Sequence, residues 1–380
     1  MIQLIQASGS GGTRAYSIGE QTGERLALSL ETYERMFAVC DISWQQACDR
    51  GMHFLDITNN VFPSVVDEIE QLAAGSGTEV ATIAALNART EILPANYLTV
   101  AAAEKQHLLQ PGNFPAECTS LAFNHKDATD CWLAQTWDWL GSQREALTLI
   151  QAQENNQPLH ITACEAGMLA KIGFNQHGLG ITLNILRSPD DGTTDGIPVH
   201  LFLRRLLDCE SVSEACDLAR QTAFCSSSNV LVADSSGAIA SLELSPRGVR
   251  VLEAEKTDNR SGGNNTPDAQ HSGLCHTNHF RHPDFAGIDD ALTANLSTAS
   301  RLEQANNAIT DISDMDGIRR LLSDTNGGEN AVCRFANEKL PPGARLETVF
   351  AVAMNLSKRE FWATQAQPST SEFELYPFMA

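Results

Sequence analysis

A break rich in proline and glycine at residues 111–115 separates two parts of the chain that have different hydrophobic periodicities. Before the break, from about residue 23 to about residue 109, apolar residues recur every three or four positions, which is typical of amphipathic helices. After it, short segments such as CTSLAF, CWLAQTW and LGITLNIL are typical of strands. The fold must therefore join a helical block to a longer part that is rich in strands.

Helical and strand-like patterns alternate in blocks within the second part. Helical spacing returns at residues 199–206, 212–219, 297–308 and 315–323, and strand patterns such as SNVLVAD, TVFAVAMN and EFWATQ lie between and after them. The opening MIQLIQA also alternates like a strand. Because strands mostly follow strands, we expect antiparallel sheets covered by helices, which is an α+β fold.

The chain is acidic, with a net charge of −21 in 380 residues. A negative field repels phosphate backbones, so we expect no nucleic-acid partner. No apolar run reaches the ~18 residues that span a membrane, and the start MIQLIQASGSGG does not resemble a signal peptide. Ten scattered cysteines without a C-x-x-C pair fit free thiols in a reducing compartment. We therefore expect a cytoplasmic protein with no membrane partner.

Cys118 differs from the other cysteines because it follows the break PGNFPAE and begins a strand-like run. A thiol at that point can attack the carbonyl carbon of the preceding residue through a five-membered ring, in which the reacting atoms are already close. Hydrolysis of the resulting thioester would free an α-amine, whose reference pKa of about 7.7–8.0 suits a general base. Cys118 would then supply both nucleophile and base. The alternative is a small buried hydrophobe.

Four further residues have side chains that suit amide or acyl chemistry. Asp138 lies at the far end of the next strand-like segment, so antiparallel pairing could return it to the nucleophile. Asn278, in CHTNHF, offers an amide donor that suits an oxyanion hole. Glu165 is an acid among glycines that mark strand turns, and Arg345, in GARLETVF, precedes a core strand.

Seven segments of the chain resemble those of the acyl-CoA:6-aminopenicillanic acid acyltransferases, also called isopenicillin N acyltransferases, and their carcinine-hydrolase-like relatives. They occur in the family's order through nearly the whole chain: LNARTE, ECTSLAF, QTWDWL, EAGMLAKIGFNQHG, GIPVHLFLRRLL, HTNHF and ARLETVF. The resemblance implies the αββα sandwich of N-terminal-nucleophile hydrolases, in which two stacked antiparallel sheets lie between helical layers.

The resemblance also implies roles for particular residues. The family's nucleophile falls on Cys118, which cleavage of the Glu117–Cys118 bond would turn into a chain terminus. The family's catalytic aspartate falls on Asp138, which would orient the thiol and the new amine. Its oxyanion-hole asparagine falls on Asn278, and its active-site arginine falls on Arg345.

Other residues are candidates for the pocket or its surroundings. Glu165 and Asn175 lie in a motif near the family's pocket, without an assigned step. Trp137 could line the pocket or belong to the core, and Ser227 could support the acyl pocket or mark the entry to a strand. Arg204 is expected on a solvated helix face. The segment CHTNHFRHP has groups that suit zinc, but no second ligand cluster accompanies it, so we expect no metal.

The resulting hypothesis is an enzyme that cuts itself and then works through Cys118. A mostly helical α part, residues 1–117, would stay with the β part, residues 118–380, in one compact domain. Cys118 would form an acyl-enzyme from a small amide or acyl substrate and then pass the acyl group to water or an amine. No cofactor is expected, although acyl-CoA could be a substrate, and a higher oligomer is left open.

Glu117 departs from the fungal penicillin enzyme, which has Gly-Cys at the cut. A glycine eases backbone strain before a nucleophile, and a glutamate beside the thiol would raise the pKa of Cys118. Cleavage could therefore be slower in this chain or depend on pH. The alternative hypothesis is a catalytically silent binding protein of the same fold that is never cut.

Overall fold

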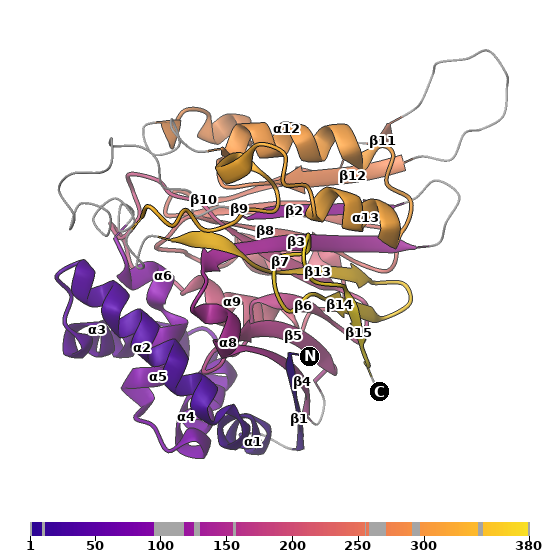
Figure 1. Cartoon of the computed structure of the whole chain (residues 1–380). Helices are drawn as coiled ribbons and strands as arrows, with labels where there is room; N and C mark the ends of the chain where they lie inside the picture. The colour runs from indigo at the N-terminus through magenta and orange to yellow at the C-terminus, as the bar shows by residue number, and fades with distance from the viewer. Residues whose placement is uncertain are drawn as a thin grey trace, which may run out of the picture.

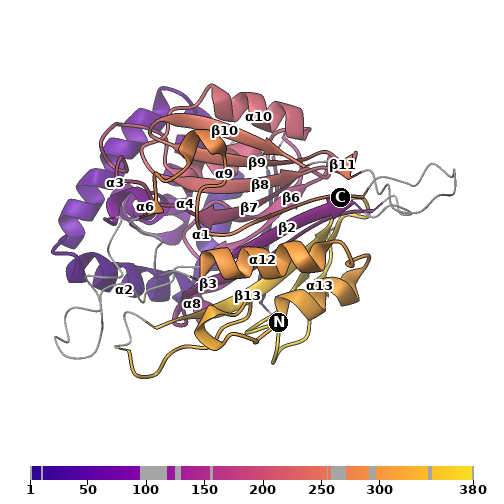
Figure 2. The same cartoon turned by 90° about the horizontal axis from the view of Figure 1, so that it is seen from above.

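The computed structural model describes residues 2–9, 12–94, 118–124, 130–154, 157–254, 256–257, 271–290, 297–340 and 345–378. Two β-sheets are stacked on each other, and helices cover their outer faces (Figures 1 and 2). The order of the layers is helices, sheet, sheet, helices. The expected four-layer αββα sandwich is confirmed.

The first sheet has the strand order β1-β4-β5-β6-β7-β8-β9-β10. Neighbouring strands are antiparallel, except that β1 pairs in parallel with β4 at the edge of the sheet. The bounds are β1 Gln3–Gly9, β4 Leu147–Glu154, β5 His160–Glu165, β6 Ile172–Asn175, β7 Gly180–Ile185, β8 Ser228–Ala233, β9 Ile239–Ser245 and β10 Gly248–Glu253. The opening strand of the chain thus belongs to the same sheet as strands from the second part.

The second sheet has the order β11-β12-β2-β3-β13-β14-β15, and its neighbouring strands are antiparallel. All ten residues of β3 are buried, because one face meets β7 and β8 of the first sheet and the other lies under a helix. The bounds are β2 Thr119–Asn124, β3 Cys131–Leu140, β11 Lys256–Thr257, β12 His271–His276, β13 Leu346–Asn355, β14 Glu360–Ala363 and β15 Glu374–Tyr376.

The helical block at the start of the chain packs against the first sheet through α1 and α2 (Figure 1). Local signals set several of its ends. Ser43 and Gln46 form a capping box at the start of α3, Pro63 begins α4, and Gly77, at φ 67°, ends it. The bounds are α1 Thr13–Thr22, α2 Glu24–Val39, α3 Trp44–Asn59, α4 Pro63–Ser76, α5 Val80–Asn87 and α6 Arg89–Ile92.

The remaining helices cover both sheets. α10 packs on β8, β9 and β10 of the first sheet, whereas α12 and α13 pack on the second (Figure 2). The bounds are α8 Gln143–Ala146, α9 Val199–Leu206, α10 Val212–Arg220, α12 Thr298–Ile309 and α13 Met315–Leu322, with short 3₁₀ turns at Pro283–Phe285 and Gly328–Asn330. Within the described ranges, no helix combines the length and the apolar character that crossing a bilayer requires.

Arg204 on α9 is buried, which corrects the expectation of a solvated helix face. Its Nε lies 2.8 Å from Glu68 Oε2, and its Nη1 lies 2.8 Å from Asp208 Oδ1. Arg14 Nη2 lies 2.6 Å from the other oxygen of Glu68. Because α9 packs against α4, the charges of Arg204 and Glu68 compensate each other between the two helices and join the helical block to the rest of the molecule.

Candidate active site

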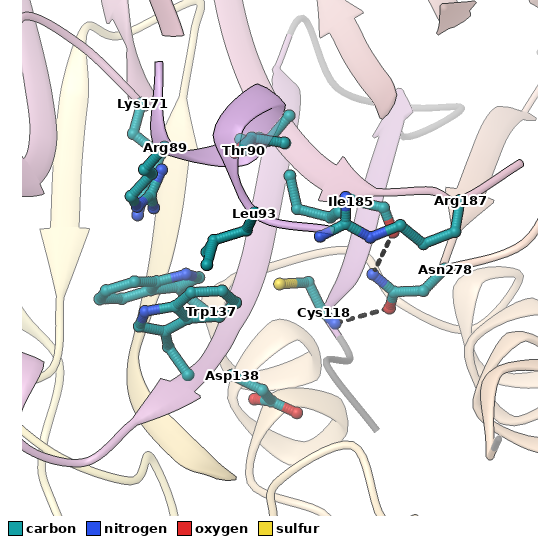
Figure 3. A pocket seen from close by; sticks show the side chains of 12 residues that line it. Arg89, Thr90, Leu93, Cys118, Trp137, Asp138, Lys171, Ile185, Arg187 and Asn278 are labelled. Atoms are coloured by element: carbon teal, nitrogen blue, oxygen red, sulfur yellow. Dashed lines mark hydrogen bonds between the residues drawn. The ribbon is translucent and has the colours of Figure 1, made fainter. Parts of the chain in front are cut away.

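Cys118 lies directly before β2 and is 5 % exposed. Its backbone nitrogen donates a hydrogen bond to Asn278 Oδ1 at 2.7 Å (Figure 3). Its carbonyl oxygen accepts from Arg301 Nη1 at 2.8 Å and from Asn184 Nδ2 at 3.1 Å. Side chains from β7, α12 and the loop after β12 therefore hold both backbone ends of this residue.

A small cavity lies beside the Cys118 side chain. Its volume of about 20 Å³ leaves room for roughly one water molecule. The sulfur points toward the side of the cavity formed by Trp137 and Leu93, and the Arg187 side chain lies across from them (Figure 3). Asp138, Lys171 and Asn278 also line the cavity. The structure thus brings together Cys118, Asp138, Asn278 and Trp137 of the residues that the sequence singled out.

Asp138 reaches the nucleophile because β2 and β3 are antiparallel neighbours, so that the end of β3 returns to the start of β2. Thr348 Oγ1 donates a hydrogen bond to Asp138 Oδ1 at 2.7 Å. Arg334 Nε lies 3.6 Å from Asp138 Oδ2. Both partners are buried, and they hold the carboxylate in one orientation beside Cys118.

The Cys118 thiol is protonated at neutral pH in the uncut chain. Burial and the Asp138 carboxylate raise its pKa to about 11, although a hydrogen bond from the Asp138 backbone and the charges of Arg301 and Lys171 oppose the rise. The thiolate is the nucleophilic form of cysteine. Attack by Cys118 therefore needs a base close to the sulfur.

The amide of Asn278 is oriented by two backbone groups. Its Oδ1 accepts from the Cys118 nitrogen, and its Nδ2 donates to the carbonyl oxygen of Ile185 at 2.9 Å. The Cys118 N–H needs an acceptor and the Ile185 carbonyl needs a donor. Only this orientation of the Asn278 amide gives its oxygen to the first and its nitrogen to the second. The oxygen of the amide faces Cys118, which differs from the expected role of Asn278 as a donor to an oxyanion and suits positioning of the Cys118 nitrogen.

Arg345 does not belong to this site, which corrects the assignment of the active-site arginine. Its Nε donates to Leu340 O at 2.7 Å and its Nη2 donates to Glu338 O at 2.8 Å, so it holds the turn before β13. Arg334, which is 2 % exposed, contacts Asp138 instead. Both arginines precede β13, and only the earlier one reaches the buried carboxylate.

Glu165 lies behind the cavity wall in a buried ion network. Lys171 Nζ is 2.5 Å from Glu165 Oε2, and Arg89 Nη2 is 3.0 Å from Oε1, which also accepts from Tyr33 OH at 2.6 Å. Burial alone would raise the pKa of Glu165, but the two cations lower it to about 2. Burial lowers the pKa of Lys171 to about 8. Glu165 therefore holds Arg89 and Lys171, which line the cavity, and does not itself face the thiol.

Trp137 forms part of the apolar wall of the cavity. Its ring stacks on that of Trp139 with the centroids 6.5 Å apart, and both rings line the cavity. Lys171 Nζ lies 3.7 Å from the centre of the Trp137 ring, a favourable cation–π distance. The wall thus combines aromatic surface with buried positive charge.

Asn175 and Ser227, which were expected at the pocket, do not line the described cavity at Cys118. Asn175 Nδ2 donates to Leu207 O at 2.9 Å and to Cys209 O at 2.6 Å, so it joins the β6–β7 hairpin to the end of α9. Ser227 Oγ donates to Asp191 Oδ1 at 2.5 Å and thereby holds the loop after β7. Both side chains stabilise turns of the first sheet.

Two other expectations concern Glu117 and a metal site. Glu117 lies outside the described residues. His276, in the segment CHTNHFRHP, has its Nε2 2.9 Å from Glu243 Oε1 and its Nδ1 2.7 Å from Thr277 O. Within the part of the chain that the structure describes, no group of three or more histidine, cysteine, aspartate or glutamate side chains is arranged to hold a metal ion.

Sequence reasoning missed Arg301 and Asn184, which hold the Cys118 carbonyl. Arg301 carried a usable signal, because it recurs with Ala305 and Ile309 on the buried face of α12, and an arginine on an apolar helix face needs buried partners. Asn184 lies in the mostly apolar run LGITLNIL, where a buried amide must also find hydrogen bonds. Neither pattern predicts that the hydrogen-bond partner is the carbonyl oxygen of Cys118.

Residues 123–370 match the family model described as acyl-coenzyme A:6-aminopenicillanic acid acyl-transferase. The chain belongs to this family. The resemblance inferred from the sequence is thereby confirmed. The matched range begins after Cys118 and includes Asp138, Asn278 and Arg334. Membership of the family supports an enzyme that transfers or hydrolyses acyl groups.

Individual proteins are similar to this chain at low identity. The acyl-coenzyme A:6-aminopenicillanic-acid-acyltransferase 40 kDa form of Emericella nidulans is 27 % identical over 292 residues, which are 75 % of this chain and 71 % of that protein. The structure of penicillin V acylase from Agrobacterium tumefaciens has 14 % identity and a TM-score of 0.42, and the match covers 65 % of this chain and 82 % of that chain. A variant of conjugated bile acid hydrolase from Clostridium perfringens has 13 % identity and a TM-score of 0.41, with 69 % and 97 % covered.

Proposed function

We propose that this chain is an amidohydrolase or acyltransferase that cuts itself before Cys118 and then uses this residue as an N-terminal nucleophile. The environment of Cys118 carries the proposal. Its side chain lines the cavity, while its own nitrogen is held by Asn278 Oδ1 at 2.7 Å. Once the bond to Glu117 is cut, that nitrogen is an amine fixed beside the thiol, where it can act as the general base.

The cut itself uses the same sulfur. Cys118 Sγ attacks the carbonyl carbon of Glu117, a thioester forms, and the C–N bond breaks as the nitrogen gains a proton. Water then hydrolyses the thioester, which restores the thiol and leaves a carboxylate on Glu117. Arg301 and Asn184 hold the Cys118 carbonyl, so the nucleophile stays in place while the bond before it breaks.

Catalysis repeats this chemistry on a small amide or acyl thioester. The Cys118 amine takes the thiol proton, and Sγ attacks the carbonyl carbon of the substrate. The leaving group departs with that proton, and the acyl group remains on the sulfur. Water then releases an acid in the hydrolase reaction, whereas an amine accepts the acyl group in the transferase reaction, for which acyl-CoA could be the donor. Asp138, held by Arg334, orients the thiol and the amine.

Intact mass spectrometry of the purified protein tests the cut. The uncut chain has a mass of 41.2 kDa. We expect fragments 1–117 and 118–380 from the wild type and only the full-length chain from Cys118→Ala. Cys131→Ala is the matched control, because Cys131 is also buried, on the neighbouring strand β3, and does not line the cavity in the described structure. It should be cut like the wild type.

Incubation of the cut protein with acylated amines and acyl thioesters tests the chemistry. We expect an acyl mass increment on fragment 118–380, and blocking Cys118 with a thiol reagent should abolish it. A wild-type protein that stays whole and takes up no acyl group would overturn the proposal. That result would favour the uncut binding protein instead.

A further inference from the structure

A second cavity, of about 360 Å³, adjoins the small cavity at Cys118. The side chains of Thr90, Leu93 and Arg187 line both cavities and form the wall that they share. Sites for small molecules have volumes of about 300–1,000 Å³. The larger cavity, which we call the outer chamber, falls in this range, whereas the cavity at Cys118 has only about 20 Å³. Most of a bound substrate must therefore lie in the outer chamber.

The outer chamber lies between the helical block and the first sheet. The turn after α2 contributes Asp41, α3 contributes Arg50, and α6 contributes Glu91. The loop after β7 contributes Asp191, and the segment before β8 contributes Ser226. Both parts of the chain are therefore needed to build the chamber, and its lining carries charges of both signs.

Glu91 lines the outer chamber, and one of its two carboxylate oxygens is left without a hydrogen bond among the described residues. Its Oε1 accepts from Ser226 Oγ at 2.7 Å and from the Val199 nitrogen at 3.0 Å. Its Oε2 is buried and has no hydrogen-bond partner among the described residues. Burial raises the pKa of Glu91 to about 7. A buried carboxylate oxygen without a donor is costly, so a ligand N–H that reaches it would be stabilised. Because this oxygen is covered, the lining around it must shift for that contact to form.

The other charged groups of the chamber have different surroundings. Asp191 accepts from the Ser188 nitrogen at 3.1 Å and from Ser227 Oγ at 2.5 Å. Arg50 is exposed at the rim and donates to Ile92 O at 3.4 Å. Arg187 lies at the wall that the two cavities share, and its positive charge disfavours a cation close to Cys118. A ligand cation is therefore favoured at Glu91, away from the sulfur.

We propose that the outer chamber binds the amine part of the substrate, and that Glu91 selects amides whose amine part carries a second, positively charged nitrogen. The inference rests on the proposed function, because it needs the amide carbonyl to reach Cys118. For that, the side chains of Leu93 and Arg187 must move apart. The net charge of −21 also favours the approach of a cation.

Three amides with the same acyl group test the inference. An acetyl group is small and so needs little widening of the cavity at Cys118. The probes are N-acetyl-1,4-diaminobutane, N-acetylpentylamine and 5-acetamidopentanoate, whose far ends are cationic, neutral and anionic. Calorimetric titration of Cys118→Ala measures binding without turnover. We expect the cationic amide to bind roughly ten to a hundred times more tightly than the neutral one, as for a hydrogen bond to a charged group.

Glu91→Gln in the Cys118→Ala background should remove this preference and leave the binding of the neutral amide unchanged. Glutamine can still accept from Ser226 and Val199, so the fold should be kept, which thermal melting checks. Asp195→Asn is the matched control. Asp195 is an exposed carboxylate that does not line the described chamber, so the preference should survive its removal.

The outcomes separate this inference from the proposed function. Equal binding of the three amides overturns the inference, and so does a preference for the cationic amide that survives Glu91→Gln. Either result does so even if acylated amines or acyl thioesters acylate Cys118 of the wild-type protein. Conversely, suppose that the cationic amide binds more tightly, and loses this preference in Glu91→Gln, while wild-type Cys118 forms no acyl-enzyme. That result supports the amine site and contradicts the proposed chemistry. Release of acetate by the wild type, followed by chromatography, provides the second measurement.

Discussion

The surroundings of Cys118 would connect activation of this residue with the proposed cut of the chain. In the uncut chain the nitrogen belongs to an amide, which is not a base, and the thiol has a pKa of about 11. Cleavage would convert the same nitrogen into an amine without moving it, because Asn278 holds the nitrogen and Arg301 holds the carbonyl. A protonated amine beside the sulfur would then stabilise the thiolate.

Arg334 and Arg345 form a matched pair for testing the site. Arg334→Ala removes the cation beside Asp138 and should slow acylation of Cys118 roughly a hundredfold, because the carboxylate that we propose orients the thiol then keeps only its hydrogen bond from Thr348. Arg345→Ala removes contacts to two carbonyl oxygens of its own turn and should leave the rate close to that of the wild type.

Single-turnover acylation, followed by mass spectrometry, measures both rates. Arg334→Lys should recover part of the lost rate, because it restores a positive charge near Asp138 without the geometry of a guanidinium. If Arg345→Ala slows acylation as much as Arg334→Ala does, or more, then Arg345 serves the reaction and the assignment to Arg334 is wrong.

At the scale of elements, Asn175 secures the hairpin of β6 and β7. It accepts from the His177 nitrogen at 3.0 Å and from the Leu179 nitrogen at 3.2 Å, while Gly178 turns the chain at φ 80°. Its amide donors also bind the end of α9. The motif that contains Asn175 is therefore explained by the turn that it builds.

Asn175→Ala should lower the free energy of unfolding by about 1–3 kcal/mol, because the carbonyl oxygens of Leu207 and Cys209 lose their donor. Urea unfolding measures this loss. The acylation rate per folded molecule should stay near that of the wild type, because Asn175 does not line the described cavity. A large fall in this rate at unchanged stability would show that the residue serves the reaction directly.

At the scale of the whole molecule, the helical block is built into the same domain as the strands. β1 pairs with β4 along seven residues. Glu68 of the helical block meets Arg204, and Arg89 meets Glu165, in buried ion pairs. Removing one partner of such a pair is strongly destabilising, so the two parts depend on each other.

A cut before Cys118 should therefore not release the helical part. We expect fragments 1–117 and 118–380 to elute together in native size-exclusion chromatography and to separate only in denaturant. Repeating the run on diluted protein is the control for weak association. Two separate native peaks would contradict this expectation, and loss of the helical part should also remove most of the lining of the outer chamber.

Several elements could be predicted from local patterns alone. The run CTSLAF corresponds to β2, LGITLNIL to β7, and the helical spacing at 199–206 and 315–323 to α9 and α13. The break before residue 118 identified Cys118 as a candidate nucleophile, because the chemistry of a thiol at the start of a strand depends on its immediate neighbours. These features are local, so the order of residues along the chain determines them.

The partners across the layers were decided only by the tertiary structure. β13 pairs with β3, which brings Thr348 and Arg334 to Asp138, and α12 brings Arg301 to Cys118. Arg345 directly precedes β13, whereas Arg334 lies twelve residues before it, so position along the chain favoured Arg345 although Arg334 is the residue that contacts Asp138. Hydrophobic periodicity tells which face of an element is buried, but not which other element covers that face. Packing of the whole chain makes that choice, and with it the composition of the site and of the outer chamber.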